Sequence, residues 1–385
     1  MEWKEDIAAD FCSSVTDGTH DSPKATINGK KLVTSKHLKD GYIDFESAKF
    51  ISEKDYLKVI ERSKVDQFDI LFSMIGTIGN IYRETSPNIE YAVKNMGIFK
   101  MGGNAIRSKW LYYWLKSKEA HAYIYERMAG STQSYLTLDS LRKFPVVYPE
   151  DINDMENIVS ILSSLDRKIE LNNKINADLE EMAQAIFKNW LSECSDEVTI
   201  GELSLNITNY EKTDAEEVVL INSSDVTEGY FDHHNYSPNK NLKGHFKKRF
   251  QKGDILYSQV RPRNRHWAYC NFDANDYLAS TQLMVIRNNP SLITSILLYQ
   301  YIISDNVWKE FTLKTETRSG TFPQGNYEDL SQIRVPYNSD VEGISNQLET
   351  LYAKMFMLEK ESSRLSLLRD TLLPRLMSGE IEIPE

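Results

Sequence analysis

The residues best suited to hydrogen-bond a ligand lie in one short loop of the second half of the chain. This loop directly follows the apolar run Asp254–Ser258, and a proline stiffens it. An arginine can hold a guanine through two hydrogen bonds, and an asparagine can hold an adenine in the same way. A solvated charged loop is the alternative interpretation. The candidate DNA contacts in this loop are Arg261, Arg263, Asn264, Arg265 and His266.

A basic run and several polar loops extend this set over both halves of the chain. Lysines spaced along a loop suit phosphate groups, which position a protein on DNA without reading its sequence. Short polar side chains in turns can reach bases, with ordinary turn chemistry as the alternative interpretation. The further candidates are Lys36, Ser131, Thr132, Gln133, Tyr135, Lys247, Lys248, Arg249, Arg318, Ser319 and Gln324.

The sequence is poor in catalytic motifs. It has no phosphate-binding Gly-x-x-x-x-Gly-Lys loop and no Gly-x-Gly-x-x-Gly after a strand. Asn289-Pro290-Ser291 lacks the second proline and the aromatic residue of an amino-methylation motif, and the histidines do not pair with cysteines at zinc spacing. The adjacent His233 and His234 are typical of a surface turn. We therefore predict a recognition or scaffold component that carries neither a catalytic centre nor a metal.

Composition places the chain among ordinary globular proteins. It has 385 residues, of which 41% are hydrophobic and 26% charged, and no segment approaches the ~18–20 apolar residues of a membrane span. Three scattered cysteines argue against a disulfide framework, so we expect a cytoplasmic protein. The net charge of −11 resides in segments 151–197 and 338–385, whereas the rest is nearly neutral. The acidic total therefore does not exclude DNA binding.

The sequence also contains an internal repeat. Asp69-Ile70-Leu71-Phe72-Ser73 returns about half a chain length later as Asp254-Ile255-Leu256-Tyr257-Ser258, and Asp40-Gly41-Tyr42-Ile43-Asp44 returns as Glu228-Gly229-Tyr230-Phe231-Asp232. Two copies of one unit predict a pseudo-twofold protein. Such a protein suits a target that comes in two spaced halves, as duplex DNA does.

Each copy ends in a long helical pattern, expected at about Asp154–Ser192 and Val341–Leu373, with Pro374 and Gly379 ending the second helix. Apolar residues recur at heptad-like steps of three and four. We predict that the two helices pair antiparallel, with separate packing on each domain as the alternative. The seam residues are Leu162, Leu165, Ile169, Leu179, Ile186, Leu348, Leu351, Met355, Leu365 and Leu372.

The predicted fold class is therefore α/β (α+β), with two mixed domains joined by two long helices. We place recognition domains at 1–150 and 198–337 and spacer helices at 151–197 and 338–385. Short apolar runs bounded by turn residues predict strands, and longer periodic ones predict helices. The clearest strands are Phe68–Phe72, Phe144–Tyr148, Ile255–Val260 and Leu283–Arg287, and the clearest helices are Ser108–Met128 and Ser291–Ile303.

Three stretches form a more specific pattern. Residues 372–381 read Leu-Leu-Pro-Arg-Leu-Met-Ser-Gly-Glu-Ile, residues 161–172 read Ile-Leu-Ser-Ser-Leu-Asp-Arg-Lys-Ile-Glu-Leu-Asn, and residues 200–203 read Ile-Gly-Glu-Leu. With these motifs the chain resembles, over essentially its whole length, the specificity subunit of type I restriction–modification enzymes. It departs from that pattern at its start, because the first domain begins at Trp3 without a Leu-Gly-Glu-Leu-like entry.

The resemblance implies that the chain does no chemistry itself. Its two target recognition domains would each bind half of a bipartite double-stranded DNA site, and the helices would set the gap between the halves. Two modification subunits that bind S-adenosylmethionine would dock on this frame and methylate adenine. Restriction subunits, which use ATP and Mg²⁺, would cleave unmodified DNA. The chain itself would hold no cofactor and contact no membrane.

The residues are compatible with this geometry. A helix of about 34 residues spans roughly 50 Å, enough to separate two readers placed one DNA turn, ~10 bp, apart. The alternative class is a coiled-coil scaffold whose two domains bind proteins; salt-dependent duplex binding would distinguish the two. A single-chain methyltransferase or nuclease is disfavoured by the missing motifs.

Overall fold

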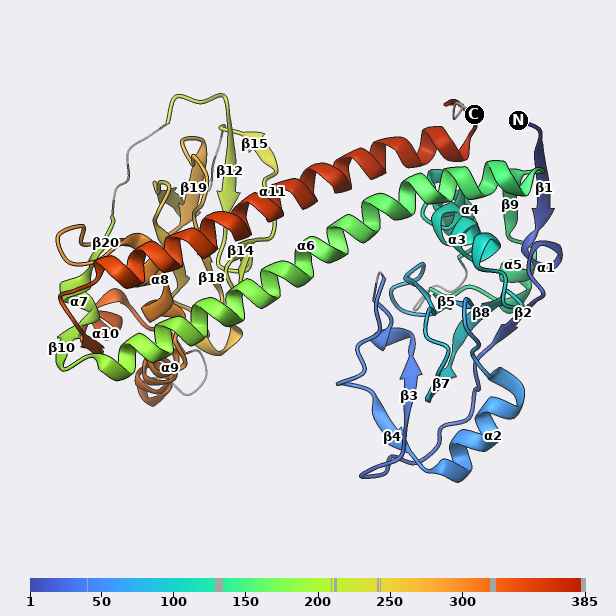
Figure 1. Cartoon of the computed structure of the whole chain (residues 1–385), viewed down its shortest axis with the longest axis horizontal. Helices are drawn as coiled ribbons and strands as arrows, with labels where there is room; N and C mark the ends of the chain where they lie inside the picture. Colours follow the sequence, from blue (N-terminus) through green and yellow to red (C-terminus); the bar gives the residue numbers. More distant parts are fainter. Residues whose placement is uncertain are drawn as a thin grey trace. The chain divides into compact units, whose positions relative to one another are not determined.

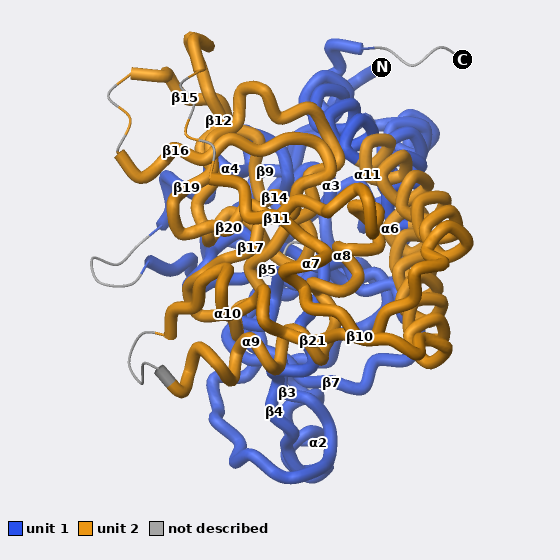
Figure 2. The backbone as a smooth tube through the Cα atoms, turned by 90° about the vertical axis from the view of Figure 1, so that its left-hand side faces the viewer, with its two compact units in different colours: residues 1–170, 363–385 blue, residues 171–362 orange. Residues whose placement is uncertain are grey.

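A computed structural model describes residues 1–39, 41–128, 134–208, 210, 213–240, 242, 244–318 and 323–381, apart from the side chain of Arg318. The chain divides into two compact units (Figure 2). Unit 1 comprises Met1–Glu170 and Ser363–Glu385, and unit 2 comprises Leu171–Ser362. Each unit therefore contains part of each long helix.

Unit 1 contains three small sheets. A two-stranded ribbon pairs the first strand with the last, Trp3 opposite Pro149, and a four-stranded sheet has the order β2-β8-β5-β6. A three-stranded sheet has the order β4-β3-β7, with β3 and β7 parallel. The strands are β1 (Trp3–Ile7), β2 (Ser14–Asp17), β3 (Lys30–Thr34), β4 (Lys49–Ile51), β5 (Ile70–Ser73), β6 (Ile81–Arg83), β7 (Tyr91–Lys94), β8 (Met96–Lys100) and β9 (Pro145–Pro149).

Short helices cover the sheets of unit 1 (Figure 1). They are α1 (Ala8–Phe11), η1 (Ser35–His37), α2 (Glu53–Ser63), α3 (Ala105–Trp114), α4 (Lys118–Arg127) and α5 (Leu138–Arg142). The single helix predicted at Ser108–Met128 is wrong, because the segment forms α3 and α4. The Ser117 hydroxyl accepts a hydrogen bond from the Ala120 backbone N–H at 3.1 Å. A serine in this N-cap position starts a new helix and so breaks the predicted one.

Unit 2 repeats this plan. Its four-stranded sheet has the order β11-β20-β17-β18, which matches β2-β8-β5-β6 position by position, and its first and last strands again form a ribbon. The strands are β10 (Asp196–Thr199), β11 (Ser204–Asn206), β12 (Glu217–Ile221), β13 (Val226–Thr227), β14 (Tyr230–Phe231), β15 (Tyr236–Pro238), β16 (Phe246–Lys248), β17 (Ile255–Ser258), β18 (Trp267–Tyr269), β19 (Tyr277–Ser280), β20 (Leu283–Asn288) and β21 (Arg334–Tyr337). The repeat predicted from the sequence is therefore confirmed in the strand order.

The second unit differs where α2 stands in the first. Between β15 and β17 it places β16, which pairs antiparallel with β19, so that the second sheet has the order β15-β12-β19-β16. Its short helices are α7 (Ile200–Leu203), η2 (Pro262–Asn264), α8 (Ser295–Ile303), α9 (Asp305–Arg318) and α10 (Tyr327–Ser331). The predicted helix start at Ser291 is four residues early, because Thr294 caps α8.

The two long helices are α6 (Ile152–Glu193) and α11 (Glu342–Met377). In unit 1 the Arg369 guanidinium donates to Asp166 at 2.8 Å. In unit 2 the Asn172 amide donates to Glu361 at 2.8 Å, and the Asn176 amide donates to the Met355 carbonyl at 3.2 Å. The rising numbers on α6 meet falling numbers on α11, so the predicted antiparallel pairing is confirmed within each unit.

The predicted seam is buried or half-buried throughout. Leu162, Leu348 and Met355 are buried, and the other seven seam residues are half-buried. Both helices also join the cores of the units, as Leu162 does with Trp110 in unit 1 and Leu348 with Tyr257 in unit 2. Pairing and packing on the domains therefore occur together, and the mixed α/β fold with two joined helices is confirmed.

The end of α11 corrects one detail. Pro374 lies inside the helix, which continues to Met377, and the Ser378 N–H donates to the Pro374 carbonyl at 3.1 Å. Gly379, with φ +75°, ends the helix in the left-handed region that favours glycine. A Cβ at this position would lie 2.7 Å from the Trp3 ring nitrogen, so glycine is also required by the close approach of β1.

Candidate nucleic-acid interface

The repeated Asp–Ser motif builds the base of an equivalent loop in each unit. Asp69 and Asp254 are fully buried. Asp69 accepts from the Lys100 ammonium at 2.6 Å, whereas Asp254 accepts from both arms of Arg287, at 2.6 and 2.8 Å. A buried carboxylate is stable only when paired in this way. The aspartates therefore fix the start of β5 and β17 rather than acting on a ligand.

The serine of the motif shapes the turn that follows each strand. Ser73 donates to the Thr77 carbonyl at 2.5 Å and accepts from the Asn80 N–H at 2.8 Å. Ser258 donates to the Val260 carbonyl at 3.0 Å and accepts from its N–H at 3.1 Å. Side-chain bonds of this kind replace strand pairing with a defined turn. The motif thus explains why both loops leave the sheet at the same point.

In unit 1 three segments meet at this turn. Ile75 forms a β-bridge with Tyr135, and the Leu136 N–H donates to the Met74 carbonyl at 2.9 Å. The Ser35 hydroxyl donates to the Asn95 carbonyl at 2.9 Å. A cavity of about 440 Å³ lies beside the Tyr135 bridge, and its lining residues are Thr34, Ser35, Lys36, Lys39, Ile75, Gly76, Thr77 and Asn95. We call this the unit 1 loop cluster.

The unit 2 loop cluster has the same construction. Val260 forms a β-bridge with Gln324, and the Gly325 N–H donates to the Gln259 carbonyl at 2.9 Å. The Gln259 N–H in turn donates to the Gln282 carbonyl at 2.9 Å. The structure therefore brings the loop after β17 together with the loop before α10, as it brings together the loop after β5 and the loop before α5.

The candidate arginines of the unit 2 loop cluster fall into two groups. Arg261, Arg263 and Asn264 are exposed, and Arg263 donates to Glu316 at 2.7 Å, which raises the pKa of its guanidinium. Arg265 is instead half-buried, with its guanidinium 4.5 Å from the centre of the Trp308 ring. His266 is also half-buried, and its Nδ1 lies 2.8 Å from the Val226 carbonyl oxygen. Arg265 and His266 therefore support the loop, whereas the first three remain candidate contacts.

The structure corrects one prediction in the basic run 247–249. Lys247 is exposed, but Lys248 is buried, and its ammonium donates to the Leu283 carbonyl at 2.6 Å. Burial lowers the pKa of Lys248. The prediction that Lys248 contacts DNA is wrong because its side chain is buried and its ammonium is bound to backbone carbonyls, next to an irregularity in the pairing of β16 with β19. Arg249 is half-buried, so Lys247 is the accessible member of the run.

The remaining candidates divide by what the structure describes. Lys36, Tyr135 and Gln324 are exposed in the loop clusters. Ser131, Thr132, Gln133 and Ser319 lie outside the described residues, as does the side chain of Arg318. The sequence alone missed Asn95, Gln259 and Gln282. The repeat carries the signal that would have found two of them, since Asn95 and Gln282 directly precede the equivalent strands β8 and β20.

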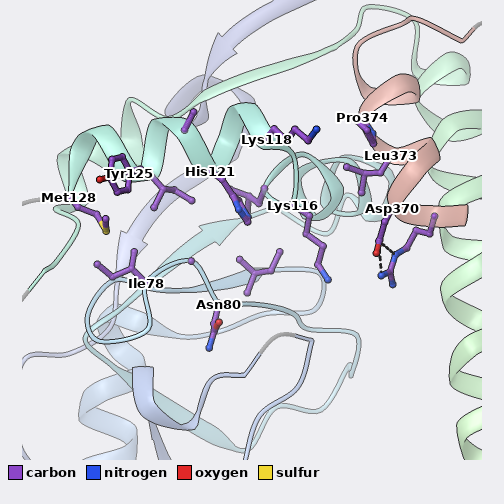
Figure 3. A pocket seen from close by; sticks show the side chains of 16 residues that line it. Ile78, Asn80, Lys116, Lys118, His121, Tyr125, Met128, Asp370, Leu373 and Pro374 are labelled. Atoms are coloured by element: carbon purple, nitrogen blue, oxygen red, sulfur yellow. Dashed lines mark hydrogen bonds and ion pairs between the residues drawn. The ribbon is translucent and has the colours of Figure 1, made fainter. Parts of the chain in front are cut away.

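Each unit also has a cleft between one of the long helices and the loop that follows its central strand. In unit 1 a cavity of about 1010 Å³ lies between α4, the loop before β6 and α11, and Figure 3 shows Ile78 and Asn80 on the loop and Leu373 on α11 facing it. Its basic side chains are Lys116, Lys118, His121 and Arg369. In unit 2 a cavity of about 400 Å³ has Glu180, Glu228 and Asp232 among its lining residues. The two clefts therefore differ in charge.

Neither a metal site nor a membrane-spanning helix is found in the described part of the chain. Those residues contain no grouping of three or more histidine, cysteine or acidic side chains that could hold a metal ion. Within the same ranges, no helix is long and apolar enough to cross a membrane. The three cysteines are free thiols, and burial raises the pKa of Cys12 and Cys270 to about 12. Cys12 and Cys270 are therefore poor nucleophiles at neutral pH.

Comparison with known proteins finds similarity to one class of protein. The model of the type I restriction modification DNA specificity domain matches residues 24–181. The specificity subunit of the type I restriction enzyme HindI from Haemophilus influenzae is 36% identical over 138 residues, which cover 36% of this chain and 30% of that relative. The specificity subunit of the enzyme MjaIX from Methanocaldococcus jannaschii is 23% identical over 312 residues, covering 73% and 71%.

A solved structure shows the same fold over nearly the whole chain. The type I restriction–modification S subunit from M. genitalium superposes with a TM-score of 0.61 at 14% sequence identity, covering 98% of this chain and 96% of that one. The alignment with the HindI subunit, in contrast, spans under a third of that relative's length. In sequence, the chain is therefore similar to type I restriction–modification specificity subunits, the family that its motifs also resemble.

Proposed function

We propose that the protein is the DNA sequence-recognition subunit of a type I restriction–modification complex. Each unit binds one half of a bipartite, gapped double-stranded target through its loop cluster. The protein does no chemistry and holds no cofactor. Two modification subunits methylate adenine with S-adenosylmethionine, and restriction subunits cleave unmodified DNA with ATP and Mg²⁺. The protein works in the cytoplasm, where it meets the DNA.

One observation carries the proposal. The same loop cluster is built twice on the same buried frame, and its exposed side chains differ between the copies. Residues exposed at loop tips on a rigid scaffold are where binding specificity is placed. Two different readers on one chain match a target with two different halves. The basic side chains Lys36, Lys247 and Arg263 beside these tips suit phosphate contacts.

Mapping of adenine methylation across a genome tests the proposal. A type I modification subunit from the same host is expressed in a strain without other methylases, with and without the chain. We expect a two-part gapped motif that appears only when the chain is present. Chain-independent methylation, or no methylation from a stable complex, would overturn the proposal. Duplex binding that weakens steeply with salt would separate DNA recognition from the protein-binding scaffold alternative.

A further inference from the structure

Three glutamines meet at the tip of the unit 2 loop cluster. Gln259 directly follows β17, Gln282 directly precedes β20, and Gln324 lies in the loop before α10. Their backbones are joined in a relay: Gln259 donates to the Gln282 carbonyl at 2.9 Å, and Gly325 donates to the Gln259 carbonyl at 2.9 Å. Backbone bonds between segments far apart in the sequence therefore bring three glutamines close together.

These side chains are available to a ligand. Gln282 and Gln324 are exposed, and Gln259 is half-buried. Among the described residues, the side-chain amides of Gln259 and Gln324 make no hydrogen bond, whereas Gln282 Oε1 accepts from the Ser223 hydroxyl at 3.3 Å. Ser223 lies just after β12, so a fourth segment orients the Gln282 amide. An oriented amide loses less conformational entropy when it binds than a free one.

Their chemistry suits base reading. A glutamine amide combines a donor and an acceptor, and it can hold the N6 and N7 edge of adenine in the major groove through two hydrogen bonds. A neutral amide gains little from a phosphate, where arginine and lysine are stronger. Basic side chains that suit phosphate contacts lie beside the glutamines. Arg261 is one residue beyond the bridge at Val260. The backbone carbonyl of His245, two residues before Lys247, accepts a hydrogen bond from the Thr281 N–H at 2.8 Å.

The equivalent positions of unit 1 carry different side chains. The Ser35–Asn95 pair corresponds to Ser223–Gln282, and the Ile75–Tyr135 bridge corresponds to Val260–Gln324. In unit 1, however, Ser35 donates to the Asn95 backbone carbonyl, and the Asn95 amide oxygen lies 2.9 Å from His20 Nδ1. Met74 stands where unit 2 has Gln259. Unit 1 thus keeps one amide of the three, at Asn95. The two loop clusters therefore present different hydrogen-bonding patterns at the same positions of the frame.

We propose that Gln259, Gln282 and Gln324 are the specificity-determining residues of unit 2, and that Gln282, held by Ser223, reads an adenine of its half-site. This inference rests on the proposed function and names the residues that carry it out. It predicts an A·T pair at a defined position in one half-site. Asn95 takes the corresponding place for the other half-site.

The experiment is methylation-motif mapping with the complete complex containing Gln282→Ala, Gln282→Glu or the control Gln347→Ala, whose residue is exposed on α11. With Gln282→Ala we expect preference for one base to fall about 5- to 150-fold at one position of one half-site. The other half-site and the gap stay unchanged. With Gln282→Glu we expect the preference at that position to move from adenine towards cytosine, whose amino group a carboxylate accepts. Gln347→Ala leaves the motif intact.

Other outcomes would overturn the inference. An unchanged motif with Gln282→Ala would exclude base reading, and equal weakening at all positions would indicate a phosphate contact or a loss of structure. Co-purification with the modification subunit distinguishes those two cases. The Asn95→Ala variant must alter the other half-site, or the two clusters are not equivalent readers. If the wild-type chain directs no motif at all, the proposed function fails rather than the assignment of the glutamines.

Discussion

The two units show which parts of a repeated frame are kept and which are changed. Both place a buried aspartate before the central strand and a serine as its last residue, and both order the four-stranded sheet identically. The tips differ at three equivalent positions, with Met74, Asn95 and Tyr135 in one unit against three glutamines in the other. Buried, paired residues fix the frame, whereas exposed tips can vary without loss of stability.

The polar contacts of the long helices differ as well. In unit 1 the Arg369–Asp166 ion pair also accepts a hydrogen bond from the Tyr113 hydroxyl at 2.6 Å. In unit 2 the position equivalent to Asp166 is Tyr352, which accepts from Gln300 at 2.5 Å. An ionic contact on one side is thus replaced by a neutral one on the other. The clefts of the two units also differ in charge: basic side chains predominate in the lining of the unit 1 cleft and acidic ones in that of the unit 2 cleft.

The largest expected effect comes from shortening the frame that both units share. Deleting one heptad from α6 and one from α11, at residues 167–173 and 360–366, removes about 10 Å of helix, or about 3 bp of DNA. We expect the methylation motif to keep both half-sites and to lose about 3 bp of gap. Motif mapping measures this directly. An unchanged gap would show that the helices do not set it.

Removal of a buried frame carboxylate comes next. Asp254→Ala leaves Arg287 without its bidentate partner, and losing one member of such a pair is expected to destabilise unit 2 by about 3 kcal/mol. Asp69→Ala should do the same in unit 1. Hydrogen exchange assigned to each unit measures both effects. The exposed Asp305→Ala is the matched control, with a change near zero; equal effects of Asp254→Ala in both units would contradict their separation.

Truncation of the helix seam should be slightly weaker and equally local. Leu348→Ala removes a fully buried side chain of unit 2, and Leu162→Ala removes its counterpart in unit 1. Each is expected to lower the free energy of unfolding by about 2–4 kcal/mol. Chemical denaturation followed by unit-specific probes gives the values. Leu367→Ala, at a side chain 70% exposed, should change stability by less than about 0.5 kcal/mol.

The smallest expected effect is a dependence of stability on pH, which arises from a buried carboxyl group of unit 2. Burial raises the pKa of Glu359 to about 7, and the Glu180 carboxylate adds to the rise, while a hydrogen bond from Asn271 opposes it. The tyrosines whose pKa values respond to these carboxylates are Tyr230, Tyr299 and Tyr352. The folded protein thus holds this proton more tightly than the unfolded chain, so stability falls as pH rises from 4.5 to about 7.

Glu359→Gln should remove this fall. At pH 5 the variant and the wild type should be almost equally stable, whereas at pH 8 the variant should be more stable by about 1–3 kcal/mol, at ~1.4 kcal/mol per pKa unit. Thermal unfolding across this range measures the difference. Glu349→Gln, an exposed position on the same helix, is the control. A variant that parallels the wild type at all pH values would show that Glu359 is not responsible.

The sequence predicted the features that depend on the heptad spacing of apolar residues and on the internal repeat. The heptad steps located both long helices and their seam, and the Asp–Ser motif located the two central strands. It could not separate Lys247 from Lys248, because their side chains take opposite faces of β16 and only the pairing with β19 decides which face is inside. Nor could it join Gln259, Gln282 and Gln324, whose proximity arises from backbone bonds between distant segments.

The boundaries of the units have a consequence for inheritance. Unit 2 is one uninterrupted stretch, Leu171–Ser362, whereas unit 1 is completed by a segment from the far end of the chain. Two genetic crossovers, at the codons for 170–171 and 362–363, would therefore replace one whole reader and leave every internal contact of the other intact. Recombination at these points could exchange half of a target preference in a single event, without any point mutation.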